Sequence, residues 1–180
     1  MNALTEALVI ERVTPGEHDE VDRLVTAAYE FDYGPREPRG DDPDSIHLAL
    51  VRARSFDVWT ARDATGTLVG TVTTPSASGD QLMEDSLPHE LDFRLLAVSP
   101  EARRRGIGAA LTRHVIDVAR DRGLRAVFMK SAPNMLGAHL LYEQLGFRRD
   151  PARDGLILGG KRVFDLFAFA YDIPPQENIR

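Results

Sequence analysis

One stretch near the middle of the chain, ELDFRLLAVSPEARRRGIGAAL, constrains the fold more than any other part of the sequence. At its start polar residues occupy every second position, at Glu90, Asp92 and Arg94, which predicts a strand with one polar and one buried face. The alternation stops at Leu95–Val98, where every residue is apolar. This break indicates either a β-bulge or burial on both faces. A bulge leaves backbone N–H and C=O groups that must bond to something, and an extended ligand that carries amides is one candidate.

A basic turn that contains glycine follows the strand and opens a helix. Gly106 and Gly108 have no side chain where the backbone must turn and be approached closely. The first N–H groups of a helix lack partners within it, and its start carries about half a positive charge, so this point suits a diphosphate. Arg103, Arg104 and Arg105 add side chains that can hold phosphate. The plain alternative is an ordinary glycine turn before a helix, and the spacing matches neither a P-loop nor GxGxxG.

The rest of the chain alternates strand and helix patterns. Residues 64–66 indicate a hairpin turn, and Asp42 or Asp44 is expected to cap a second helix that follows the loop at 34–40. The expected strands are 7–13, 56–63, 67–74, 91–98, 124–130 and 163–173, with a weaker one at 155–158; the other expected helices are 17–31, 106–122 and 133–145. Strands that precede, separate and follow the helices predict an α/β (α+β) fold with a mixed sheet.

Composition narrows the functional classes. The 180 residues fit one domain, which we expect to span 1–180. The chain has no cysteine and its five histidines lack ligand spacing, so we expect no disulfide, no thiolate nucleophile and no metal. A net charge of −6 argues against general nucleic-acid binding. Because the sequence has neither a run of about 20 apolar residues nor a signal-peptide pattern, we expect a cytoplasmic protein that does not bind membranes.

Two motifs, in this order, resemble the GNAT family of N-acetyltransferases. The acetyl-CoA motif of that family is a strand, then Arg or Gln, two residues, Gly, one residue, and Gly or Ala at a helix start. Arg103, Gly106 and Gly108 match it, and LLAVSP, which two residues separate from Arg103, matches the strand ending of the family; LYEQLGF at Leu141–Phe147 matches a second family feature. The resemblance implies the GNAT fold, with a central sheet of about six to seven strands, about four helices and a β-bulge in the fourth strand. It also implies an acetyl-CoA-binding core at about 90–147, and the chain is similar to an actinobacterial-type subgroup.

The resemblance implies roles for individual residues. Backbone groups of Leu96, Ala97 and Val98 would pair with the pantetheine arm of acetyl-CoA. Backbone N–H groups at the helix start would hold the pyrophosphate with Arg103 alongside, and they belong to Arg104, Arg105, Gly106, Ile107, Gly108 and Ala109. Tyr142 matches the tyrosine near the thioester sulfur. Asn134 resembles an asparagine that contacts the cofactor, although Met135 holds its usual position.

Acetyl transfer to an amine needs groups that move protons. An alkylammonium has a pKa near ~10, so a base must take its proton, and the thiolate that leaves, with a pKa near ~8.5, must receive one. Asp92 aligns with a position that is often acidic in the family, and Glu90 points to the same side, so both are candidate bases. The alternatives are solvated charges or a pair with Arg94. Tyr142 is the candidate acid, and its alternative is a tyrosine packed against the sheet.

These observations predict an N-acetyltransferase that moves acetyl from acetyl-CoA to a primary amine by direct attack in a ternary complex. The oxyanion would be bound by the N–H of Val98. A non-catalytic acyl-CoA-binding or sensing module is one alternative, and transfer of a longer acyl chain is another. We expect a small-molecule or peptide acceptor and a possible homodimer. Acids that would suit a cationic acceptor are Asp80, Glu84, Asp85, Glu90 and Asp92.

Overall fold

A computed structural model of the chain describes residues 8–35 and 45–175. Contacts divide the chain into two compact units. The first unit contains the residues up to Asp80 together with Leu95–Leu111, and the second contains Gln81–Arg94 and the residues from Thr112 onward. The single domain expected over 1–180 stays a prediction.

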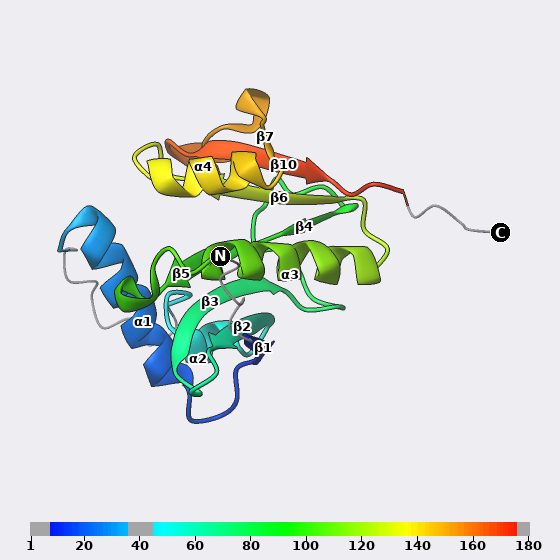
Figure 1. Cartoon of the computed structure of the whole chain (residues 1–180). Helices are drawn as coiled ribbons and strands as arrows, with labels where there is room; N and C mark the ends of the chain where they lie inside the picture. The colour runs from blue at the N-terminus through cyan, green and yellow to red at the C-terminus, as the bar shows by residue number, and fades with distance from the viewer. Residues whose placement is uncertain (1–7, 36–44, 176–180) are drawn as a thin grey trace. The chain divides into compact units, whose positions relative to one another are not determined.

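The first unit is built on a sheet with the strand order β1-β2-β3-β5 (Figure 1). Its elements are β1 (Val9–Arg12), α1 (His18–Tyr33), α2 (Ala49–Arg52), β2 (Phe56–Arg62), β3 (Leu68–Pro75), most of β5 (Arg94–Val98), the 3-10 helix η1 (Pro100–Ala102) and the start of α3 (Ile107–Asp121). The first three strands pair antiparallel, and the β2–β3 hairpin turns where 64–66 predicted. The expected apolar stripe of α1 is buried in one cluster with Val58 and Leu68, and its members are Val21, Leu24, Val25 and Ala28.

The second unit is built on a mixed sheet with the order β4-β6-β10-β7. Its elements are β4 (Glu90–Asp92), the rest of α3, β6 (Ala126–Ser131), α4 (Leu136–Gln144), β7 (Arg148–Arg149), η2 (Pro151–Arg153), β8 (Leu156–Leu158), β9 (Lys161–Phe164) and β10 (Phe167–Asp172). β4 runs parallel to β6, whereas β10 runs antiparallel to both β6 and β7. A parallel pair needs a crossover, and α3 lies in the connection between β4 and β6.

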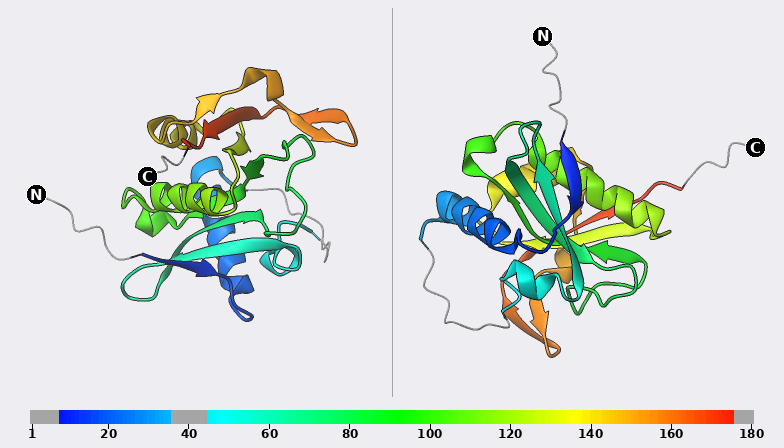
Figure 2. Two further views of the ribbon diagram at one scale, coloured as in Figure 1. Left: turned by 90° about the vertical axis from the view of Figure 1, so that its right-hand side faces the viewer. Right: turned by 90° about the horizontal axis from the view of Figure 1, so that it is seen from below.

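A separate ribbon of two strands, β8 and β9, precedes β10 and extends from one end of it (Figure 2, orange). Gly159 and Gly160 form its turn with φ of 56° and 73°. Two successive positive φ values are those of a type I′ hairpin turn, which glycine adopts without strain. The weak strand expected at 155–158 is therefore present as β8.

The structure corrects several expected elements. The single strand at 91–98 is two strands, β4 and β5, which belong to different sheets. The single strand at 163–173 is also two, β9 and β10, and between them the carbonyl of Leu166 accepts a hydrogen bond from Gly155 N–H at 2.8 Å. α2 is one short turn preceded by Leu48, and Asp42 and Asp44 lie outside the described residues.

The apolar stripe of α3 is mostly as expected. Ile107, Leu111 and Val115 are buried, but Val118 is half-buried, and Ile116 and Ala119 complete the buried face. Within residues 8–35 and 45–175, no helix is both long and apolar enough to cross a membrane.

Candidate active site

Strand β5 offers one edge to an extended ligand. It is the last strand in the order β1-β2-β3-β5, and Leu95 has a positive φ of 53° where the alternation of the sequence fails. Beyond that point, the groups of Leu96–Val98 that point away from β3 meet no strand in the described sheets. Such an edge pairs readily with an extended chain that carries amides, as the pantetheine arm of acetyl-CoA does.

The turn after β5 leads into α3 through two residues with positive φ, Arg104 at 58° and Gly106 at 77°. The helical hydrogen bonds begin when Ala110 N–H donates to Gly106 O at 2.9 Å. A Cβ added at Gly106 would meet no atom within 4 Å, so the space beside the turn is open. The start of the helix and the positive end of its dipole therefore border open space, which fits the diphosphate of acetyl-CoA.

Two of the three arginine side chains beside this space are paired with carboxylates. Arg103 makes a bidentate ion pair with Asp32 of α1, with both N–O distances at 2.9 Å. Arg105 lies 3.3 Å from a carboxylate oxygen of Asp63, and Arg104 is exposed. The Arg103 guanidinium is thus bound to a carboxylate in this structure, and its contact with phosphate stays a prediction.

Gly70 of β3 lets the start of α3 approach the sheet closely. A Cβ at this position would lie 2.8 Å from Leu111 Cδ1 and 2.9 Å from Ile107 Cγ2. It would also lie 3.2 Å from the carbonyl oxygen of Ala97 in β5. One glycine thus sets the spacing between β3, β5 and the first turn of α3.

In the second unit, the acids of β4 do not lie on an exposed polar face, although the sequence predicted that they would. Asp92 is fully buried, and its carboxylate accepts hydrogen bonds from Met83 N–H at 2.7 Å, Ser86 Oγ at 2.6 Å and Leu82 N–H at 3.1 Å. Burial raises the pKa of Asp92, while these hydrogen bonds oppose the increase. The contacts are those of a residue that holds the 82–86 segment against β4.

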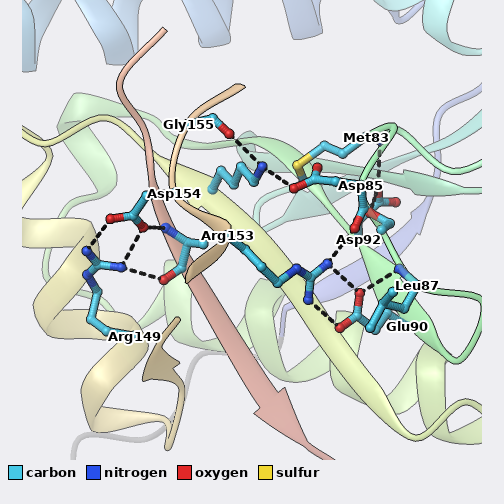
Figure 3. Close-up of polar contacts among 12 residues, drawn as sticks. Met83, Asp85, Leu87, Glu90, Asp92, Arg149, Arg153, Asp154 and Gly155 are labelled. Carbon is cyan, nitrogen blue, oxygen red and sulfur yellow. Dashed lines mark hydrogen bonds and ion pairs between the residues drawn. The ribbon is translucent and has the colours of Figure 1, made fainter. Parts of the chain in front are cut away.

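Glu90 has a partner that the sequence analysis missed. Arg153 of η2 binds both carboxylate oxygens, at 2.7 and 2.9 Å, and Leu87 N–H donates to the same carboxylate at 2.8 Å (Figure 3). Arg153 also donates to Asp85 O at 2.7 Å and lies 3.5 Å from the ring centroid of Phe128. The expected alternative, a pair with Arg94, is replaced by this bidentate pair.

The neighbouring acids are also engaged. Lys130 of β6, whose side chain is 1% exposed, binds the Asp85 carboxylate and donates to Gly155 O at 2.6 Å. Glu84 accepts a hydrogen bond from Gly159 N–H at 3.0 Å. Lys130 and Arg153 therefore offset the charges of Asp85 and Glu90, so these two acids no longer support a preference for a cationic acceptor.

Tyr142 lies in the aromatic core of the second unit. It is 3% exposed, and its ring centroid is 6.0 Å from that of Phe93, 5.7 Å from Phe147 and 5.8 Å from Phe169. The ring therefore packs as in the alternative interpretation, a tyrosine packed against the sheet, and the role of the hydroxyl stays a prediction. Asn134 is exposed just before α4, and Met135 occupies the N-cap position of that helix without a capping hydrogen bond from its side chain.

His139 lies one helical turn before Tyr142 and forms a buried polar contact. Its Nε2 is 3.2 Å from Ser131 Oγ, and its ring centroid is 5.1 Å from that of Phe169. Burial lowers the pKa of His139, so the imidazole favours its neutral form. Among the described residues, no group of three or more His, Asp or Glu side chains is placed to hold a metal ion.

An open strand edge that continues into a glycine turn and a helix start suits an extended, phosphorylated ligand held by main-chain groups. Comparison with known proteins agrees, since a model of the acetyltransferase (GNAT) family matches residues 20–147. The chain belongs to this family.

Relatives and solved structures support the family and the fold. The chain is 30% identical to mouse (Mus musculus) N-acetyltransferase 8 over 137 residues, which cover 76% of the chain and 58% of that protein. A GNAT acetyltransferase from Staphylococcus aureus superposes with a TM-score of 0.70 at 15% identity, covering 92% of this chain and 99% of that one. Spermidine N-acetyltransferase from Vibrio cholerae, solved with CoA and spermine, gives 0.65 at 17% identity, covering 92% and 95%. These superpositions confirm the predicted fold class, while the chain spans about half the length of the curated relatives that it matches.

Proposed function

We propose that this chain transfers an acetyl group from acetyl-CoA to a primary amine. The observation that carries the proposal is the continuous main-chain surface formed by the open edge of β5, the turn at Arg104 and Gly106, and the start of α3. An extended thioester with amides at one end and a diphosphate at the other matches these groups in order along the chain. Family membership supports the same ligand.

The reaction that we propose is a direct attack. The neutral amine adds to the thioester carbonyl, and the N–H of Val98 stabilises the oxyanion that forms. When the carbon–sulfur bond breaks, the CoA thiolate leaves and takes a proton, which we assign to the hydroxyl of Tyr142. The amide product loses its extra proton to a base. No acyl-enzyme is needed, since the sequence has neither a cysteine nor a GxSxG motif.

The base and the acceptor stay predictions. Asp92 and Glu90 remain candidate bases, but the hydrogen bonds around both carboxylates favour a role in holding the 82–87 segment. Exposed acids that still suit a cationic amine are Asp80 and Glu84. The cytoplasmic location, the homodimer and the actinobacterial-type subgroup likewise stay predictions.

The first experiment is titration calorimetry of the full chain with acetyl-CoA, followed by turnover with a panel of primary amines. CoA release can be followed with a thiol reagent without background, because the chain contributes no cysteine. We expect binding and amine-dependent release. Binding without turnover for any amine in the panel would favour the sensing module, and no binding would refute the proposal.

Replacing Gly108 by tryptophan tests the main-chain surface, because a large side chain at the helix start should block the diphosphate and weaken acetyl-CoA binding. Wild-type affinity in Gly108→Trp would contradict this placement.

Replacing Tyr142 by phenylalanine keeps the aromatic packing and removes the hydroxyl. We expect unchanged acetyl-CoA affinity and a turnover lower by roughly 10²- to 10⁴-fold. Wild-type turnover would contradict the assignment of the proton donor.

A further inference from the structure

We infer that Arg103 is a positioning residue, which fastens the diphosphate-binding turn to the C-terminal end of α1, and that Asp32 is its essential partner. The inference rests on the proposed function, because it concerns how the acetyl-CoA surface of the first unit is held in shape.

The guanidinium of Arg103 connects three segments. It pairs with both oxygens of Asp32 at 2.9 Å and donates to the carbonyl of Ala28 at 3.3 Å, both on α1. Its Nε donates to the carbonyl of Val98 at 3.3 Å, at the end of β5. Bidentate pairing of this kind fixes the orientation of the guanidinium as well as its distance. The end of β5 and the turn are thereby tied to one helix.

The C-terminal end of α1 needs a cation at this point. The last turn of the helix contains no basic residue, and Asp32 places a negative charge near the negative end of the helix dipole. Arg103 supplies the positive charge from 71 positions further along the chain, and its guanidinium also lies 5.5 Å from the ring centroid of Phe31. The pair therefore stabilises the helix end and the turn together.

The turn itself requires such support. Arg104, which directly follows Arg103, has a φ of 58°, a conformation that residues other than glycine keep only when their surroundings hold it. Hydrogen bonds from Arg103 to α1 and β5 provide that restraint one residue before the strained position. Without them, the turn and the helix start that follows would relax away from the geometry that receives a diphosphate.

The test separates positioning from direct contact with phosphate through Asp32→Asn. This nearly isosteric change removes the ion pair but leaves the arginine free to reach a phosphate. Acetyl-CoA affinity is measured by calorimetry on the full chain, well below the melting temperature of each variant. We expect Asp32→Asn and Arg103→Gln each to weaken binding by roughly 10-fold. The double variant should have no lower affinity than whichever single variant has the lower affinity, since both changes break the same contact.

The matched control is Arg62→Gln. Arg62 pairs with Glu17 at 2.6 Å and Glu20 at 2.8 Å, so it ties the other end of α1 to β2. This variant should lose stability but keep the wild-type affinity. If Arg103 had only a structural role, the Arg103 variants would likewise lose stability and keep the wild-type affinity. Arg103→Lys, which keeps the charge but not the fork, replaces Arg103→Gln if the latter does not fold.

Wild-type or tighter binding by Asp32→Asn would overturn the inference, as would additive losses in the double variant. If the wild-type chain itself failed to bind acetyl-CoA, the proposed function would fall instead, so the two failures are distinguishable.

Discussion

Replacing Gly70 by alanine puts one methyl group between β3 and the first turn of α3. The added carbon would lie 2.8 Å from Leu111 Cδ1, 2.9 Å from Ile107 Cγ2 and 3.2 Å from the carbonyl oxygen of Ala97. Leu111 and Ile107 are 0% and 2% exposed, so neither side chain can swing into solvent. Overpacking of this kind costs about 1–3 kcal/mol, and the lower entropy of the unfolded alanine chain offsets about 0.4–1 kcal/mol. We therefore expect a net loss of about 1–2 kcal/mol.

The assay is urea unfolding followed by circular dichroism, with acetyl-CoA affinity measured on the folded variant. Each 1 kcal/mol should lower the melting temperature by about 2–4 °C in a chain of this size. Because the first turn of α3 must shift, affinity should fall as well. The matched control is Gly137→Ala on α4, where an added Cβ meets nothing within 4 Å, and the same substitution should stabilise by about 0.5–1 kcal/mol. Equal stability and affinity in Gly70→Ala and the wild type would refute the reasoning.

Two further predictions concern the second unit. Glu90→Gln or Arg153→Met should each cost about 3 kcal/mol in urea unfolding, because each leaves a largely buried partner charge unpaired, whereas replacing both by methionine should recover part of the loss. A double variant as unstable as the sum of the single ones would contradict this. Burial lowers the pKa of His139 below its ordinary value of 6.5, so the unfolded chain takes up the proton first, and stability should fall as the pH drops below about 6.5. His139→Gln should show a shallower slope over that range, and an unchanged slope would exclude His139 as a source.

Local patterns predicted the parts of the site that depend on neighbours in the chain. The loss of alternation after Arg94 placed the backbone interruption, and Leu95 has a positive φ at that point. The glycine turn placed the start of α3 correctly, because capping and turn chemistry involve adjacent residues. That the interruption separates two strands of different sheets is a tertiary result, since it depends on the pairing of β5 with β3 and of β4 with β6.

Contacts between distant residues could not be predicted in the same way. Alternation placed Glu90 on a polar face, but the residue that permits its burial, Arg153, lies 63 positions away. Arg103 looked like a phosphate ligand because it belongs to a basic run, whereas its carboxylate partner lies 71 positions earlier. The sequence did not indicate a role for Gly70, which lies in an apolar strand, because that role is to let α3 approach the sheet closely. In each case the signal is a pairing that a single sequence does not reveal.

The free edge of β5 also has a cost for the protein in the absence of its ligand. An edge strand that pairs with an extended ligand can also pair with the edge strand of another protein molecule, which is how many folded proteins begin to aggregate. The side chains of Leu95 and Leu96, both half-buried, would strengthen that association. Saturating coenzyme should therefore act as a chaperone for this chain by keeping concentrated samples monodisperse during storage.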